Sequence, residues 1–422
     1  MPITTTLRMV DLRKLQRLHY GWSSPDGASL AHQRIRRNRK RSALRMAHHC
    51  CDVKPARHNG VMNAFTDAIQ FAQSHEVPWP RDPHAAPLPG QVPFGVHHGD
   101  PAPWNVLRGP VHMRGGVSGV VLQRGVEVAA WGAPDRADQT FSVAKTYLAL
   151  LAGVANARGL LPDVDEPVVA RVPGIGFDSA HNRSITWAHL LEQTSEWEGT
   201  CFGLPDTVDR YRTVSHDPRP PAGVKGDARP LHTPGTYWEY NDVRINQLSL
   251  ALLHLFRQPL PEVFLHTILQ PLGGGEGFRW EGYDDAWTEI VDASCTKRRV
   301  QSVPGGTHWG GGVSISARDQ ARIAEWMRSG GRHREQQIVS AQWLARMTEP
   351  CAIAPFYGWL TWLNRDGRNF PGASTQASFM IGAGGHYVWI EPVHEAVVVV
   401  RWLDSAHAPG FIERIAAALG KH

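Results

Sequence analysis

Cysteine is scarce in this sequence of 422 residues, which contains five cysteines. An odd and sparse set does not form the paired framework that stabilises small secreted domains, so we expect free thiols and a reducing compartment. Two of the five lie in residues 48–52, "HHCCD", where adjacent ligands without a second spaced pair make a poor tetrahedral metal site. The sequence therefore predicts neither a disulfide scaffold nor a metal centre.

Long apolar runs are also missing. No stretch reaches membrane-spanning length, and no charged segment followed by an apolar one suggests an export signal. The glycine-rich stretches at residues 273–277 and 310–312 lack the strand, lysine and spacing of a phosphate-binding loop, so they are typical of turns. We expect a cytoplasmic protein with no membrane contact and no nucleotide or other cofactor.

Negative charge is nearly absent from residues 1–61, where 13 Lys and Arg stand against three Asp. The whole chain has 44 basic and 39 acidic side chains, so the other 361 residues hold 31 basic and 36 acidic ones. This balance is ordinary for a cytosolic enzyme. The composition predicts a disordered basic tail over residues 1–61, followed by a folded domain over residues 62–422.

Two explanations of the tail are open. Its arginine-rich run could bind nucleic acid or an anionic membrane surface, which would make the protein a binder acting through residues 1–61. Alternatively, the tail is an artefact and Met62 is the true start, because patterned sequence begins there. We favour the second explanation, and we expect no nucleic acid partner for the folded domain.

The apolar pattern divides the folded part into strands at both ends and helices in the middle. Residues 116–132 contain two β-branched runs separated by Arg-Gly, which is typical of a hairpin. Helical spacing predicts helices at residues 143–160, 186–193, 242–256, 317–331 and 340–349. Further strands are predicted at residues 357–363, 385–392 and 395–403, before a last short helix. We predict an α+β fold in which both chain ends build one antiparallel sheet, with flanking helices and an inserted, mostly helical lobe.

The stretch "TFSVAKTYLALLAGVANARGLL", residues 140–161, places Ser142 at the start of an apolar helix and Lys145 one turn later. Residues i and i+3 share a helix face, so the lysine can reach the serine oxygen. A serine nucleophile needs a neighbouring base, and both burial and the positive helix end would lower the pKa of this lysine toward useful values. The backbone N–H of Ser142 is also suited to an oxyanion hole.

The Ser-x-x-Lys pattern is not specific by itself. It recurs at Ser294 and Lys297, where the following "RRVQSVPGG" cannot continue as an amphipathic helix, so we expect a solvated loop there. Residues 232–247, "HTPGTYWEYNDVRINQ", add a second clue, because a Pro-Gly turn leads to Tyr240 and Asp242 directly before a helical run.

Together these residues resemble the serine beta-lactamase-like family, which includes class C beta-lactamases, D-Ala-D-Ala peptidases, family VIII esterases and 6-aminohexanoate-dimer hydrolases. The resemblance covers residues 110–420, including "ILQPLGG" and "WGGGVSISARDQARI", in the order typical of the family. It implies that Ser142 is the nucleophile, that Lys145 is its base partner, and that Tyr240 shares the proton and passes it to the leaving group.

Two positions depart from the family's pattern. The third motif should contain a lysine or histidine just before residues 385–392, but the segment reads "ASFMIGAGGHYV". An ungapped placement puts residues 377–379 on the motif and Met380 near the second oxyanion N–H, although the glycines allow other registers. Asp242 stands where an asparagine would donate to the substrate, and it cannot donate when ionised. Both departures favour a neutral ester or a linear amide over a beta-lactam.

Further pocket candidates are Gly384 and His386, which lie beside the third motif, and the loops at residues 203–235 and 275–306, which we expect to shape the pocket. Three tryptophans beside motif positions could wall an apolar acyl pocket, although buried tryptophans more often belong to the core: Trp238, Trp309 and Trp359.

The sequence thus predicts a serine hydrolase, an esterase or amidase, that cleaves a small ester or amide through an acyl-enzyme on Ser142. It would need neither metal nor cofactor, and its partner would be a small molecule. A non-hydrolytic penicillin-binding-type sensor and an acyltransferase of the same fold stay open as alternatives. The sequence predicts no oligomeric state.

Overall fold

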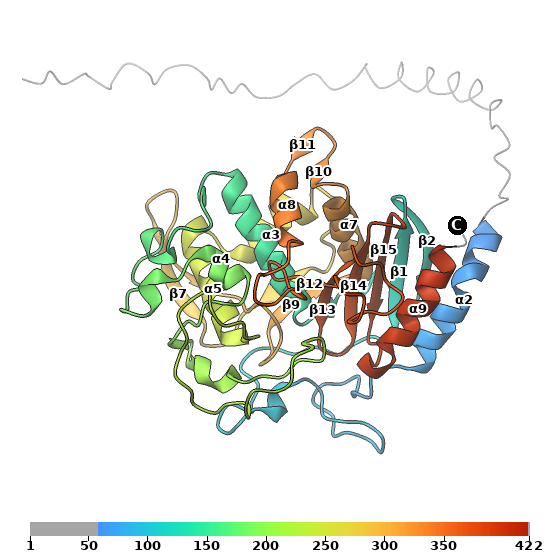
Figure 1. Ribbon diagram of the computed structural model, residues 1–422, viewed down its shortest axis with the longest axis horizontal. Helices are drawn as coiled ribbons and strands as arrows, with labels where there is room; N and C mark the ends of the chain where they lie inside the picture. Colours follow the sequence, from blue (N-terminus) through green and yellow to red (C-terminus); the bar gives the residue numbers. More distant parts are fainter. Residues whose placement is uncertain (1–57, 421–422) are drawn as a thin grey trace, which may run out of the picture. The chain divides into compact units, whose positions relative to one another are not determined.

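The computed structural model describes residues 58–420, with side chains from residue 64 onward. Residues 1–57 of the predicted basic tail, with residues 48–52, lie outside these residues, whereas residues 58–61 are helical and not disordered as predicted. The start at Met62 stays a prediction. All residues described here belong to one unit (Figure 1).

The centre of this unit is a six-stranded antiparallel sheet that both chain ends build. Its order is β12-β13-β14-β15-β1-β2, so the early hairpin joins the late strands through the pairing of β1 with β15. The prediction of one antiparallel sheet from both ends is confirmed. The strands of this sheet are β1 Ser118–Gln123, β2 Val126–Trp131, β12 Trp362–Leu363, β13 Ser378–Gly382, β14 His386–Glu391 and β15 Ala396–Arg401.

The sheet is covered on both faces, which explains why β14 and β15 are buried along their whole length. Helices α3 and α7 pack on one face, whereas α2 and α9 lie side by side and cover the other (Figure 1). None of the helices in the described part is both long and apolar enough to cross a membrane. The bounds are α2 His58–Ser74, α3 Val143–Ala157, α7 Ala317–Arg328 and α9 Ala408–Leu419.

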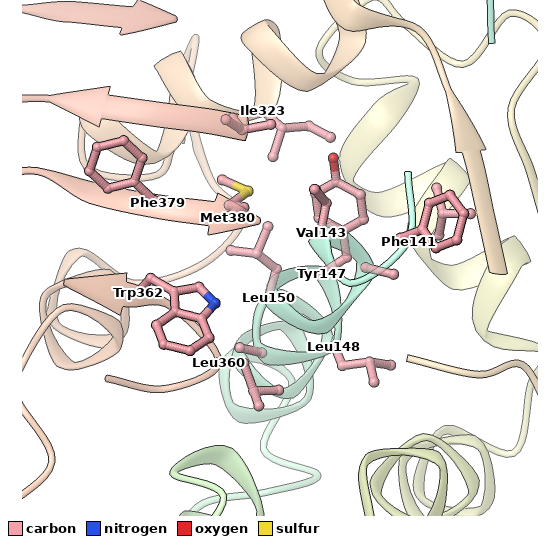
Figure 2. Close-up of a cluster of buried hydrophobic side chains, with 14 of the residues drawn as sticks. Phe141, Val143, Tyr147, Leu148, Leu150, Ile323, Leu360, Trp362, Phe379 and Met380 are labelled. Atoms are coloured by element: carbon pink, nitrogen blue, oxygen red, sulfur yellow. The ribbon is translucent and has the colours of Figure 1, made fainter. Parts of the chain in front are cut away.

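Helix α3 is buried on every side from Val143 to Ala155, as expected of a helix that is apolar all round. Figure 2 shows its side chains Tyr147 and Leu150 among residues from the sheet and from α7. The first turn of α3 therefore has a fixed place between the sheet and the helical lobe, and this turn holds Ser142 and Lys145.

The inserted lobe contains the remaining helices, α4 Trp187–Leu191, α5 Asp242–Phe256, α6 Leu260–Phe264 and α8 Ala341–Met347. All five helices predicted from periodicity are present: α5 has the predicted bounds, and the other four are shorter than predicted. Small sheets complete it: β3 Asp138–Gln139 with β9 Gly312–Ile315 and β6 Arg279–Glu281, β4 Thr200–Cys201 with β5 Leu204–Pro205, β7 Trp287–Val291 with β8 Lys297–Gln301, and β10 Arg332–His333 with β11 Gln336–Gln337.

Two local predictions have different outcomes. The strand predicted at residues 357–363 is wrong over most of its length, because Leu360 has a left-handed backbone (φ 49°) and only Trp362–Leu363 pair with β13. The second Ser-x-x-Lys match does lie on a solvated turn, between β7 and β8. There Ser294 is exposed and its hydroxyl donates to Asp292 at 2.6 Å.

Candidate active site

A tight turn presents Ser142 at the N-terminus of α3. Phe141 has a left-handed backbone (φ 51°), which is strained for a bulky residue and costs on the order of 1–3 kcal/mol. Packing holds it, because its ring is buried among those of Trp79, Phe94 and Trp402. Ser142 itself is half-buried and its side chain makes no capping hydrogen bond to the helix. Its hydroxyl is therefore free for another partner.

That partner is Lys145, which is buried one turn along α3. Its Nζ donates to Ser142 Oγ at 2.9 Å and to the carbonyl oxygen of Gly305 at 3.3 Å. Gly306 packs directly over the pair: a Cβ atom there would lie 3.3 Å from Lys145 Nζ and 3.4 Å from Ser142 Oγ. The absence of a side chain at this position leaves room for the serine and the lysine.

Asp242 lies in the first turn of α5 and is the counter-ion of Lys145. Its Oδ1 is 2.5 Å from Lys145 Nζ without a well-aligned hydrogen bond, so this contact is mainly electrostatic. Its Oδ2 is 2.6 Å from Arg212 and 2.9 Å from His308 Nδ1. Burial alone would raise the pKa of the Asp242 carboxyl, but Arg212, Lys145 and His308 outweigh burial and hold it well below its usual range.

The position of Asp242 corrects its predicted role. We expected this residue to face the substrate, but it is buried and its carboxylate is shared among three basic side chains. It does not line the cavity beside Ser142. These contacts indicate that Asp242 positions Lys145 and does not bind the substrate.

A second layer of ion pairs surrounds this centre. Asp209 faces Arg212 at 3.0 Å and Lys225 at 3.1 Å, and together with His308 these cations overcome burial and lower its pKa to about 2. Lys225 also pairs with Asp100. The ligand atoms of Asp100, Asp209 and His308 lie within 4.8 Å of one another, close enough to hold a metal ion. However, the Lys225 ammonium already contacts both carboxylates and compensates their charge.

Buried ion pairs also fix the loop at residues 203–235, which carries Arg212 and Lys225. Arg229 binds Glu196 in a bidentate pair at 2.6 and 2.7 Å and contacts Glu239 at 2.9 Å. Bidentate pairs of this kind restrict geometry as well as adding energy. The loop is therefore attached to the lobe, and its two cations have defined positions.

Tyr240 completes the group of predicted catalytic residues. Its ring lies between two cations, with Lys145 Nζ 4.8 Å and the Arg212 guanidinium carbon 5.3 Å from the ring centre. Trp362 stacks on the same ring at 5.7 Å. The structure thus brings Ser142, Lys145 and Tyr240 together, and Ser142 and Tyr240 both line one cavity.

This cavity has a volume of about 440 Å³. The lysine and arginine side chains that line it are Lys225 and Arg212, and none of the described residues that line it is Asp or Glu. The acidic partners of these cations lie behind them, because Asp209 and Asp242 do not reach the cavity. The cavity therefore presents positive side chains to a substrate.

Aromatic side chains form another part of the cavity lining, here called the aromatic wall. It contains Trp79, Trp362, Tyr387 and His216, and the His216 ring also packs on Phe370 at 4.9 Å. Burial lowers the pKa of His216 to about 4. The wall is therefore neutral near pH 7 and suits an apolar or aromatic substrate group.

The third motif lies in a different register from the ungapped placement. Residues 381–385, the turn between β13 and β14, line the cavity, and Gly384 is among them. Met380 is buried on the α3 side of the sheet (Figure 2) and does not line the cavity. His386 is also buried, with its ring 4.3 Å from that of Trp402, and burial lowers its pKa well below the usual range. The predicted pocket contacts of Met380 and His386 are therefore wrong.

The three tryptophans considered as pocket walls belong to the core instead. Trp238 lies behind Tyr240, and Trp309 supports the ring of His308. Trp359 packs on Trp343. None of the three lines the cavity. Sequence reasoning missed the residues that surround the centre, although it pointed to the loop that supplies two of them: Asp100, Arg212, Lys225, Gly306 and His308.

Two features define a beta-lactamase-like fold. One is the sheet built from both chain ends, and the other is the buried helix α3, which begins at a serine. The family model Beta-lactamase matches residues 106–418, so the chain belongs to the beta-lactamase family. Membership of this family supports a serine hydrolase in general terms.

Solved structures agree at the level of the fold. A protein described as a 6-aminohexanoate-dimer hydrolase from Bacillus anthracis matches with a TM-score of 0.51 at 17% identity, over 72% of this chain and 79% of the other. EstCE1, a hydrolase with promiscuous acyltransferase activity, and a protein described as a beta-lactamase from Bacteroides dorei DSM 17855 each match with a TM-score of 0.50 at 17% identity, over 72% and 93%. No curated protein sequence matches this chain.

Proposed function

We propose that this protein is a serine hydrolase that cleaves a small ester or amide through an acyl-enzyme on Ser142. The observation that carries the proposal is the 2.9 Å contact between Ser142 Oγ and Lys145 Nζ at the edge of a cavity that Tyr240 also lines. A serine of this kind needs a partner for its proton, and here one lies within hydrogen-bond distance.

The proton follows a short path in this mechanism. Lys145 acts as the base after it has given up one ammonium proton to solvent. As Ser142 Oγ attacks the substrate carbonyl carbon, Lys145 takes the hydroxyl proton, and Asp242 compensates the charge of the ammonium that forms again. Tyr240, whose ring faces Lys145, shares this proton and delivers it to the leaving oxygen or nitrogen. A water molecule then attacks the acyl carbonyl carbon, the bond to Ser142 Oγ breaks, and Tyr240 and Lys145 pass the proton of the water to Oγ, so that the carboxylic acid leaves.

Backbone N–H groups would stabilise the oxyanion. The first belongs to Ser142 at the N-terminus of α3, where the helix dipole favours negative charge. We place the second in the β13–β14 turn, because Gly382 packs so closely on residue Thr140 that a Cβ atom would lie 2.1 Å from its carbonyl oxygen. The end of β13 therefore lies beside the nucleophile.

The charge of the cavity changes the expected substrate. The missing third-motif cation suggested a neutral substrate, but Arg212 and Lys225 line the cavity from a different segment. The guanidinium of Arg212 contacts Asp209 and Asp242 through Nη1, and the same side chain lines the cavity. We propose that an ester or amide carrying a carboxylate beyond the reacting bond is preferred over its neutral counterpart.

Two activities of the same centre are the alternatives. In a penicillin-binding-type sensor the acyl group stays on Ser142, and in an acyltransferase an alcohol or amine replaces water. EstCE1, which shares the fold, is itself described as a hydrolase with acyltransferase activity. Mass spectrometry of the protein after one equivalent of ester, with and without added alcohol, separates a persistent acyl-enzyme from hydrolysis and from transfer.

The test of the proposal is a pair of serine variants. Ser142→Ala should lose both turnover of 4-nitrophenyl esters and covalent labelling by a fluorophosphonate. Ser294→Ala, the serine of the exposed second Ser-x-x-Lys match, is the matched control and should retain both. Labelling that persists in Ser142→Ala would refute the assignment.

We keep three further expectations as part of this proposal. The reaction needs no metal or cofactor, the partner is a small molecule, and the protein works in the cytoplasm. The three cysteines in the described part, Cys201, Cys295 and Cys351, are all unpaired, which is consistent with a reducing compartment.

A further inference from the structure

His308 lines the inner end of the candidate active-site cavity and is otherwise buried. Its side chain is 2% exposed, and its ring stacks on Trp309 with ring centres 3.9 Å apart and planes 20° from parallel. The indole N–H of Trp309 donates to the carbonyl oxygen of Trp104, which fixes the supporting ring. The imidazole therefore has little freedom to rotate.

Both ring nitrogens of His308 face buried carboxylates. Nδ1 is 2.9 Å from Asp242 Oδ2, and Nε2 is 2.9 Å and 3.1 Å from the two oxygens of Asp100. An ionised carboxylate only accepts hydrogen bonds, so the ring satisfies both partners only when each nitrogen carries a proton. The ring thus bridges Asp242 and Asp100 through its two nitrogens.

The bond to Asp242 also determines how this carboxylate is turned. His308 and Arg212 both bind Oδ2, which leaves Oδ1 directed at Lys145. Lys145 in turn lies 2.9 Å from Ser142 Oγ. The imidazole is thus connected to the nucleophile through Asp242 and Lys145. None of these contacts joins His308 directly to Lys145 or Ser142.

We propose that His308, oriented by Asp100, is a positioning residue that turns the Asp242 carboxylate so that Lys145 stays within hydrogen-bond distance of Ser142. This inference rests on the proposed function and adds a residue to it. Without the imidazole, Asp242 can rotate and draw Lys145 away from Ser142. Misplacement of a reacting group by about 1 Å lowers a rate about 100-fold, so we expect a loss of that order in acylation.

Two isosteric variants distinguish positioning from a purely structural role. The amide nitrogen of asparagine occupies the place of Nδ1, so His308→Asn keeps the donor to Asp242. The amide nitrogen of glutamine occupies the place of Nε2, so His308→Gln keeps only the donor to Asp100. We expect His308→Gln to lose about 100-fold in the rate of fluorophosphonate labelling and in kcat, with KM changed little, and His308→Asn to recover most of that loss.

Controls and an independent readout complete the experiment. His254→Gln, a half-buried histidine on α5 outside the cavity, should label at the wild-type rate. A crystal structure of His308→Gln should show Lys145 Nζ beyond hydrogen-bond distance of Ser142 Oγ, and this readout does not depend on turnover. Equal labelling rates in both His308 variants, or an unchanged distance in the crystal, would overturn the positioning role. Absence of labelling in the wild type would instead refute the proposed function, and the crystal structure would still decide on His308.

Discussion

Lys145 and Asp242 form a buried ion pair in which Nζ and Oδ1 are 2.5 Å apart. The carboxylate compensates the charge of the buried Lys145 ammonium. Asp242 is thus a partner of Lys145 during proton transfer rather than a contact for the substrate.

Replacement of Asp242 by asparagine should therefore impair both stability and acylation. Asp242→Asn leaves Lys145 without its counter-ion, and removing one partner of a buried pair costs about 3–5 kcal/mol. We expect a lower free energy of unfolding in chemical denaturation and slower fluorophosphonate labelling of Ser142. The exposed Asp366→Asn should change neither measurement. A variant with wild-type stability and labelling would show that the pair is dispensable.

Gly306→Ala tests the space around the nucleophile. Its φ angle lies outside the left-handed region, so alanine causes no backbone strain there, but its Cβ would lie 3.3 Å from Lys145 Nζ and 3.4 Å from Ser142 Oγ. The contact with Lys145 Nζ is tight enough that the lysine must move by a few tenths of an ångström. We expect kcat for a 4-nitrophenyl ester to fall about tenfold or more, since reacting groups must be held closely.

The control for this substitution is Gly420→Ala, at the end of α9, where the nearest atom to a new Cβ is an ordinary 3.6 Å away. It should keep the wild-type kcat. If Gly306→Ala also kept it, the serine and lysine would have more freedom than their contacts with Gly306 indicate.

His216 makes stability depend on pH. Its pKa is about 4 in the folded protein because of burial, whereas a free histidine has a pKa near 6.5. The unfolded chain therefore binds more protons between these values, and stability should fall as pH drops from 6.5 toward 4, by up to about 3 kcal/mol from this residue. Well above pH 6.5 His216 should have no effect on the pH dependence of the free energy of unfolding, because it is neutral in both states.

His216→Phe removes the titration and keeps an aromatic ring against Trp362 and Phe370. Urea denaturation of the wild type and the variant at several pH values should show a smaller loss of stability in the variant between pH 6.5 and 4. The exposed His84→Gln should follow the wild type. If the free energy of unfolding fell equally with pH in His216→Phe and the wild type, protonation of His216 would not be the cause.

The elements that the sequence predicted are those whose pattern is local. Helices α3, α5 and α7 bury faces that repeat at helical spacing, and the hairpin β1–β2 turns at Arg124 and Gly125, both with positive φ. Ser142 and Lys145 could be paired from spacing alone, because one helical turn fixes their relation.

The remaining parts of the site depend on contacts between distant segments. Asp100 and His308 are 208 positions apart, and no periodicity connects them. The register of the third motif was also beyond the sequence, because β13 is buried on both faces at Ser378 to Met380, so no alternation marks its cavity side. The glycines after Ile381 then allow several alignments.

The charge of the cavity leads to a prediction about substrate choice. Two 4-nitrophenyl esters of equal length are compared, one of glutaric acid with a free carboxylate and one of pentanoic acid. A hydrogen bond to a charged group contributes about 1.5–3 kcal/mol, so the wild type should show at least about tenfold higher kcat/KM for the acidic ester. Arg212→Gln should reduce this ratio toward one, because its guanidinium lines the cavity.

Arg219→Gln in the same loop is the matched control: Arg219 pairs with Asp217 outside this cavity, so the ratio should stay as in the wild type. A wild type that prefers the neutral ester, or a preference for the acidic ester that survives in Arg212→Gln, would mean that the loop cations serve only the buried carboxylates behind them.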